Sequence, residues 1–192
     1  MMRGETGFPR ADVTDDFLRL RRRQVRARLA AWLRHAPDDV DILSLNEVLD
    51  ALGRRGERRL GLQTIRLNTI VGTVDSNRDF DRGFLPTSGR VRERWERLAL
   101  AQRRGEPIPP IEVYRVGDLH FVQDGHHRVS IAMSAGAKTI DAYVTEVLTR
   151  LPTAGIRGRG DLPCRVTSRH LPLGRPDRKR ASINTSLAGT AA

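Results

Sequence analysis

The chain has 192 residues, of which 39% are hydrophobic and 30% are charged, and its formal net charge is +11. This composition indicates one globular domain with polar appendages, and the absence of any run of 18 apolar residues excludes a transmembrane helix. The N-terminal residues lack the apolar centre of a secretory signal, so we expect a cytoplasmic protein. The single cysteine, Cys164, excludes an internal disulfide and a cysteine-rich zinc site.

The excess positive charge lies mainly at the ends of the chain. Residues 1–60 have 13 basic and 10 acidic side chains, residues 61–147 have 12 and 11, and residues 148–192 have 9 and 2. A basic surface attracts nucleic-acid phosphates, so DNA is a candidate partner. Because the central segment is nearly neutral, that attraction would come mostly from the tail.

The first predicted element is a helix from Phe17 to His35, with Thr14 as its N-cap and Pro37 at its end. Five apolar residues share one face of this helix: Leu18, Val25, Leu29, Trp32 and Leu33. Arginines occupy much of the remaining surface, which indicates an amphipathic helix with a solvated basic face. The alternative is a helix that contacts phosphate or docks a partner.

A second, shorter helix is predicted to follow Ser44. Ser44 and Glu47 have the spacing of a capping box, and Gly53 can end the helix. The charged residues of the segment 53–61 predict a linker. The alternation in the segment 63–72 predicts a strand.

The acidic segment after this strand resembles part of a calcium loop. Asp75, Asn77 and Asp79 have the first spacings of such a loop, but Phe80 stands where glycine is needed and Pro86 where the bidentate glutamate is needed. We therefore interpret it as a functional loop or a rigid turn.

The remaining elements alternate between helix and strand. The pattern predicts a helix over residues 90–104, a hairpin of strands 111–116 and 119–123, a helix over 126–135 and a strand over 139–147. The fold class is therefore α+β, with a small sheet. Glycines and prolines interrupt the residues that follow, which predicts a basic disordered tail over 149–192.

The turn Asp124–Arg128 contains more side chains that can bind a ligand or transfer a proton than any other segment of similar length. Gly125 permits a sharp turn, and the amides of residues 126–129 would be unpaired at a helix start, which is a favourable site for phosphate. Arg128 can bind phosphate oxygens, and His126 and His127 can donate to phosphate or move a proton. Asp124 can orient a histidine, hold Mg²⁺ through water or act as a base. The alternative is a turn and helix cap with surface histidines.

The segment from about residue 60 to 147 resembles the ParB/sulfiredoxin superfamily. The resemblance lies in the order of its elements, the Pro-Pro-Ile-Glu-Val-Tyr hairpin and the Gly-x-x-Arg frame of Gly125-His126-His127-Arg128. The Asp-Gly-x-x-Arg form also resembles the free-serine kinases of that superfamily. Similar stand-alone bacterial proteins have an Asp-Gly-His-His-Arg turn.

The resemblance implies a division of the chain into a helical segment 1–59, a ParB/sulfiredoxin-like domain 60–148 with a small mixed sheet and flanking helices, and the tail 149–192. It implies that the turn binds nucleotide phosphates, with Gly125, His127 and Arg128 as ligands and ATP or CTP with Mg²⁺ as the cofactor. The sulfiredoxin nucleophile would fall on His126, so sulfiredoxin activity is not expected. Partition proteins have a helix-turn-helix domain where this chain has its tail, so plasmid partition is not expected either.

Three functions follow from these observations. The first is a ParB-like nucleotide-binding module, which could act as a DNA-associated regulator. The second is a phosphotransferase or nuclease that acts through Asp124, His126 or His127, with Asp79 or Asp81 as a second acid or Mg²⁺ ligand. In the family fold the loop that holds these two acids, with Phe80 and Phe84, would face the turn. The third is a nucleic-acid-binding protein that uses its basic ends. The sequence predicts no bound metal beyond Mg²⁺ and leaves the oligomeric state open.

Overall fold

The computed structural model describes residues 8–35, 42–74, 79–156 and 159–163. Its elements in chain order are α1 (Pro9–Leu33), β1 (Leu43–Ser44), α2 (Leu45–Leu52), β2 (Arg54–Arg66), β3 (Ile70–Thr73), α3 (Arg92–Arg103), β4 (Ile111–Val116), β5 (Leu119–Asp124), α4 (His126–Ser134) and β6 (Thr139–Thr149). Two short 3-10 helices are also present, η2 (Leu67–Thr69) and η3 (Arg159–Asp161).

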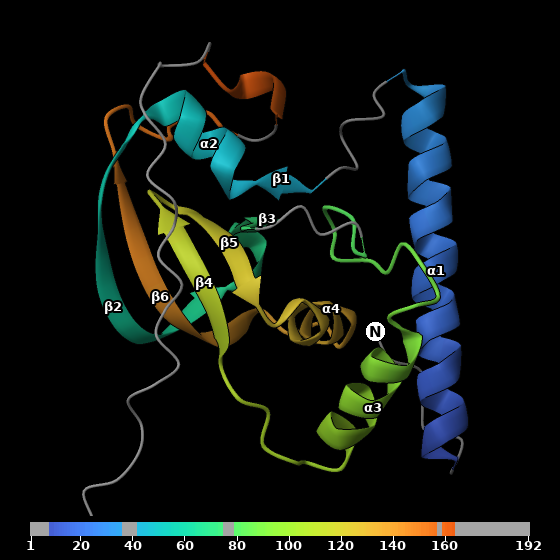
Figure 1. Cartoon of the computed structure of the whole chain (residues 1–192). Coiled ribbons are helices and arrows are strands. Elements are labelled where there is room, and N and C mark those ends of the chain that lie inside the picture. Colours follow the sequence, from blue (N-terminus) through green and yellow to red (C-terminus); the bar gives the residue numbers. More distant parts are fainter. Residues whose placement is uncertain (1–7, 36–41, 75–78, 157–158, 164–192) are drawn as a thin grey trace, which may run out of the picture.

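The strands form one mixed sheet in the order β1-β3-β5-β4-β6-β2 (Figure 1). The hairpin β4–β5 and the pair β2–β6 are antiparallel, whereas β1–β3, β3–β5 and β4–β6 are parallel. Gly117 makes the hairpin turn with a φ of +57°, as its two-residue connection predicted. The α+β class and the predicted hairpin are confirmed.

Residues 54–61 of the segment that was predicted as a linker belong to a strand, so that prediction is wrong. These residues form the first half of β2, which pairs with β6 from Arg54 opposite Thr149 to Arg66 opposite Thr139. The register shifts at Gly56 and Gly61, as is usual for bulges. Because β2 is an edge strand with one solvated face, charged side chains are compatible with it. The boundary expected at residue 60 therefore falls inside a strand.

Residues on both sides of the expected domain also join the sheet. β1 pairs with β3, and α2 packs on the sheet through a cluster that includes Leu45, Leu52 and Phe121. The predicted strand 63–72 is divided by η2 between β2 and β3. Ile156 is buried in the same cluster, so the first residues of the predicted tail are ordered. Residues 164–192 lie outside the described residues.

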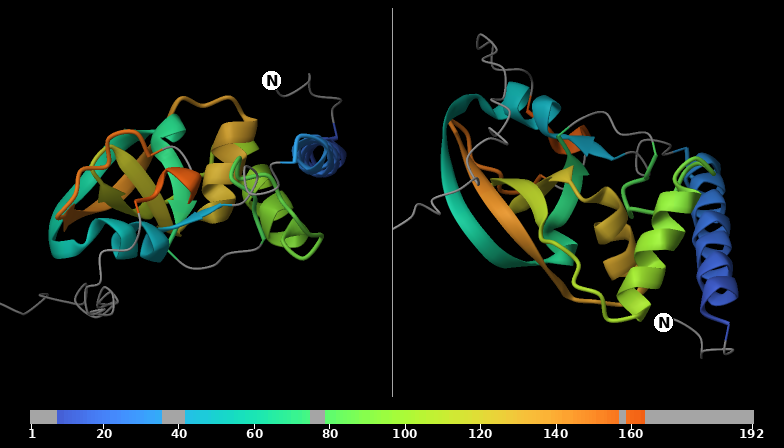
Figure 2. Two further views of the ribbon diagram at one scale, coloured as in Figure 1. Left: turned by 90° about the horizontal axis from the view of Figure 1, so that it is seen from above. Right: turned by 60° about the horizontal axis from the view of Figure 1, so that its bottom comes forward.

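α1 is the outermost element, and the face that it buries is not the predicted one. Figure 2 shows α4 beside the sheet, α3 next to it and α1 beyond α3. The inner face of α1 buries Val13, Phe17 and Ala31, and Asp16 accepts a hydrogen bond of 2.5 Å from Arg103 of α3. The apolar face that was expected to pack inward, which includes Trp32, is exposed.

α3 and α4 are joined by a buried contact. Trp95 of α3 is fully buried, donates from its indole Nε1 to Ser130 Oγ at 3.0 Å, and lies with its ring centroid 5.7 Å from that of Phe17. Val91, at the start of α3, and Ala99 are also buried. These contacts fix α4 between the sheet and the outer helices. No helix among the described residues is long and apolar enough to cross a membrane.

Candidate functional site

The turn between β5 and α4 requires glycine at position 125. Gly125 has a φ of +107°, and a Cβ atom there would lie 2.5 Å from Cγ2 of Ile111 in the neighbouring strand. A larger residue would therefore meet both an unfavourable backbone conformation and a steric clash. The predicted sequence of strand, tight turn and helix is confirmed.

The amides of three residues lie at the N-terminus of α4. The amide of Val129 donates to the carbonyl of Gly125 at 3.0 Å, which is the first backbone hydrogen bond of this helix. The sequence predicted that the amide of Val129 would be unpaired, which is wrong. The amides of His126, His127 and Arg128 precede it, at the end of the helix that carries the positive partial charge. This arrangement favours an anion.

The guanidinium of Arg128 is held at this helix start by the chain itself. Its Nη1 donates to the carbonyls of Pro109 at 2.7 Å and Pro110 at 2.6 Å, and its Nη2 donates to Oδ2 of Asp124 at 2.5 Å. The Arg128 side chain is 12% exposed, whereas that of Asp124 is 47% exposed. Both Nη1 hydrogens are thus used, and Nη2 retains one hydrogen for another acceptor.

His126 is oriented by a hydroxyl from β3. The hydroxyl of Thr73 donates to the carbonyl of Val122 at 3.0 Å, and its oxygen lies 2.7 Å from Nε2 of His126. Because a hydroxyl has one hydrogen, Nε2 of His126 is the donor in this second contact, which assigns the ring tautomer. Phe80 and Phe84 stack against the ring with centroid distances of 6.3 and 6.2 Å.

His127 is held in its neutral form. The pKa of His127 is lowered to about 4, first by burial and then by the charges of Arg94 and His126, and the charges of Asp79 and Asp124 offset part of this shift. The edge of its ring meets Phe80 at 5.1 Å, and its Nε2 is buried without a hydrogen-bond partner among the described residues. A buried nitrogen without a hydrogen-bond partner lowers the stability of the fold.

The two acids of the loop before α3 lie in different surroundings. Asp79 is close enough to His127 to raise the pKa of that ring, and its carboxylate accepts from Ser88 Oγ at 3.5 Å. Asp81 is buried and accepts from the amides of Gly83 and Leu85, both at 2.9 Å. Burial raises the pKa of Asp81. Asp79 therefore lies near His127 of the turn, whereas Asp81 stabilises the conformation of its own loop.

The backbone of Phe84, whose ring stacks on His126, has an unfavourable conformation. Its φ is +53°, which is rare for a bulky residue, and its side chain is fully buried. The expectation that the loop and its two phenylalanines face the turn is met by the ring contacts with Phe80 and Phe84. Thr73, Pro109 and Pro110 were not predicted as parts of the site, because only the fold places them there.

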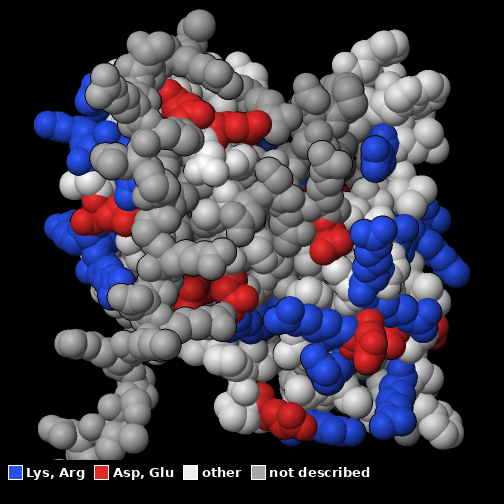
Figure 3. Space-filling model, viewed as in Figure 1, with Lys and Arg blue, Asp and Glu red and all other residues white. Residues whose placement is uncertain are grey.

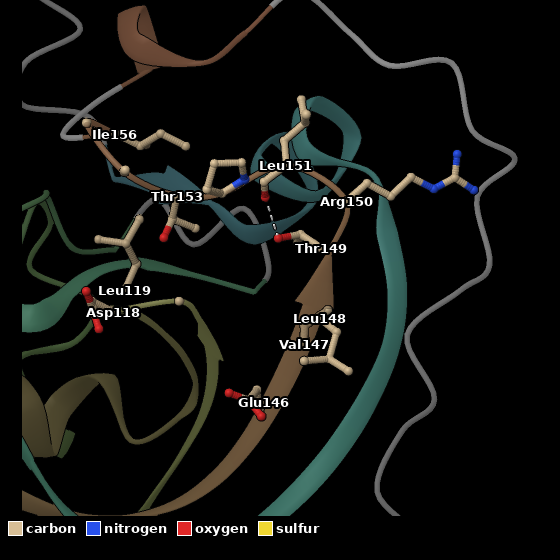
Figure 4. Close-up of a pocket in the computed structure, with 14 residues that line it drawn as sticks. Asp118, Leu119, Glu146, Val147, Leu148, Thr149, Arg150, Leu151, Thr153 and Ile156 are labelled. Carbon is tan, nitrogen blue, oxygen red and sulfur yellow. Dashed lines mark hydrogen bonds between the residues drawn. The ribbon is translucent and has the colours of Figure 1, made fainter.

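A separate open cavity of about 770 Å³ lies at the other end of β5. Figure 4 shows residues 146–151 at the end of β6 around it, with Asp118 and Leu119 from the hairpin. Leu119 and Asp124 are the two ends of β5, so this cavity is not at the turn. Among the described residues, no three His, Cys, Asp or Glu side chains gather closely enough to hold a metal ion.

Comparison with models of protein families gave no match, and comparison with curated proteins gave none either. Among solved structures, the chain is similar to the crystal structure of sulfiredoxin from Arabidopsis thaliana, with 18% sequence identity and a TM-score of 0.34. The similarity covers 45% of this chain and 86% of the sulfiredoxin chain. It is a distant likeness, and the assignment of the turn rests on the geometry described above.

Proposed function

We propose that the start of α4 binds the phosphates of a nucleotide, ATP or CTP, together with Mg²⁺. The observation that carries the proposal is the left-handed Gly125, which leaves the amides of residues 126–128 at the positive end of α4. Arg128 adds a cationic charge and one remaining Nη2 hydrogen at the same place. The Gly-x-x-Arg frame, which resembles that of the ParB/sulfiredoxin superfamily, agrees with this assignment.

Asp124 is the residue that fits Mg²⁺. Its carboxylate is half exposed and adjoins the amides of α4. Magnesium in nucleotide sites is commonly held by one or two carboxylates together with water and the phosphates themselves, so a single acid is sufficient. When bound, the ion would neutralise phosphate charge that Asp124 would otherwise repel.

The rings of Phe80 and Phe84, which stack on His126, are both buried, so they support this histidine from behind and offer no surface to a base. Catalysis by Asp124, His126 or His127 stays a prediction. With a pKa of about 4, His127 would be a weak general base at neutral pH.

Titration calorimetry of the full chain with ATP, CTP and GTP, with and without Mg²⁺, tests this function. We expect one of the first two to bind in the micromolar range only with Mg²⁺, and Arg128→Ala to weaken binding by about tenfold or more. Because Arg128 also holds the prolines before β4, Asp124→Asn provides a second variant. It keeps the shape of the turn and should remove the effect of Mg²⁺.

Arg97→Ala, on the exposed surface of α3, is the matched control and should bind as the wild type does. Thermal unfolding of each variant shows whether it is folded. The proposal fails if the folded wild type gives no heat of binding with any of the three nucleotides, or if Arg97→Ala weakens binding as much as Arg128→Ala.

A second candidate is the binding of DNA, which is favoured by the distribution of arginines. Figure 3 shows basic side chains over β2 and over α1 and α3. Arg55, Arg58 and Arg59 are exposed on β2, and Arg92, Arg94 and Arg97 are exposed on α3. Acidic residues are interspersed on both elements, so this surface supports non-specific attraction to phosphates rather than a specific site.

A further inference from the structure

The outer face of α1 carries an apolar stripe that is interrupted by Asp15 and Arg22. Most of the large apolar side chains that are exposed among the described residues lie on it or at the N-cap of α1: Phe8, Leu18, Val25, Leu29, Trp32 and Leu33. Trp32 is 67% exposed. A stripe of this kind on a soluble helix marks a surface that another molecule covers.

The stripe has the spacing of a two-helix seam. One row repeats every seven residues through Phe8, Asp15, Arg22 and Leu29, and a second row through Ala11, Leu18, Val25 and Trp32. All eight residues are exposed, and at 100° per residue they lie opposite the buried Val13, Phe17 and Ala31. Two rows offset by three and four residues are the pattern that pairs one long helix with another.

We propose that the occupant of this stripe is α1 of a second copy of the chain, in antiparallel orientation. The two charges within the stripe decide the orientation. A parallel pair would set Asp15 against Asp15 and Arg22 against Arg22, which is unfavourable for both. An antiparallel pair with Phe8 opposite Trp32 sets each Asp15 about 4.5 Å along the axis from Arg22 of the other copy.

The stripe is therefore complementary to itself only in one direction. Two-fold symmetry repeats the Asp15–Arg22 ion pair on either side of the centre of the seam and places a Phe8–Trp32 pair at each end. α1 has 25 residues and is about 37 Å long, so the seam spans five turns or more of each helix. Because α3 packs on the inner face of α1, the two sheets would lie on opposite sides of the helix pair and leave both turns at α4 accessible.

The oligomeric state of the full chain, measured by sedimentation over a concentration series, tests this pairing. We expect the wild type to be a dimer. The two single variants, Asp15→Arg and Arg22→Asp, should each be monomeric. The double variant Asp15→Arg/Arg22→Asp restores opposite charges across the seam and should restore the dimer. Arg97→Asp, which makes the same charge change on exposed α3, should leave the dimer intact.

All four variants change exposed residues, so their helical circular dichroism should equal that of the wild type. A wild type that is monomeric throughout the concentration series would overturn the proposal and would leave the stripe to a different partner. A dimer that persists in both single variants and in Val25→Glu would also overturn it, because the subunits would then associate through another surface.

Discussion

A side chain at position 125 would collide with the strand behind it. Gly125→Ala should lower the free energy of unfolding by about 2–4 kcal/mol, because the left-handed conformation and the contact with Ile111 each oppose a Cβ atom. Urea unfolding measures this loss. Gly136→Ala is the matched control, since Gly136 is also left-handed but a Cβ atom there would meet no neighbour within 4 Å; its loss should be about 1 kcal/mol. Equal losses in both variants would contradict the steric argument.

Among single residues, the sequence predicted the position of site residues best where reactive side chains lie within a recognisable local pattern of strand, turn and helix. Asp124, Gly125 and Arg128 could be placed at a strand–helix turn because glycine, the strand pattern and the helix pattern meet there. The partners of Arg128 could not be predicted, because the carbonyls of Pro109 and Pro110 approach it only when the hairpin folds. Local patterns do not specify such long-range contacts.

At the scale of elements, one hydrogen bond joins α3 to α4. Ser130→Ala should lower the free energy of unfolding by about 1–3 kcal/mol, because it leaves the buried indole N–H of Trp95 without an acceptor. Ser134→Ala is the control on the same helix: its hydroxyl donates to the carbonyl of Ile131, and its loss should be within about 0.5 kcal/mol. Thermal and urea unfolding of both variants measure the difference. A neutral Ser130→Ala would show that this bond does not couple the helices.

Two elements were misjudged from the sequence for physical reasons. The charged residues of β2 predict a linker over part of its length, because such residues are common in loops, yet an edge strand tolerates charge on its solvated face. In α1 the sequence predicts an amphipathic helix with a solvated basic face, but the inner face relies on Phe17, on small residues and on the ion pair of Asp16 with Arg103. Periodicity identifies an apolar face and does not say which molecule covers it.

At the scale of the whole molecule, positive charge outweighs negative charge, and the imbalance is greatest at the C-terminal end. Residues 164–192 contain six basic and one acidic side chain. If the chain binds DNA, its affinity should fall steeply as salt rises, and removal of these residues should reduce that slope substantially. Fluorescence anisotropy with a labelled duplex over a range of salt concentrations measures both effects. Unchanged binding after the deletion would show that the tail is not the source of attraction.

Phosphate binding at the start of α4 is the central proposal, and the amide NMR spectrum of the full chain tests it most directly. On addition of ATP or CTP with Mg²⁺, the largest shifts should appear at the amides of His126, His127 and Arg128. The amide of Gly136, beyond the other end of the same helix, should stay in place. Unchanged amides at residues 126–128, or larger shifts around the cavity at Leu119, would contradict the proposal.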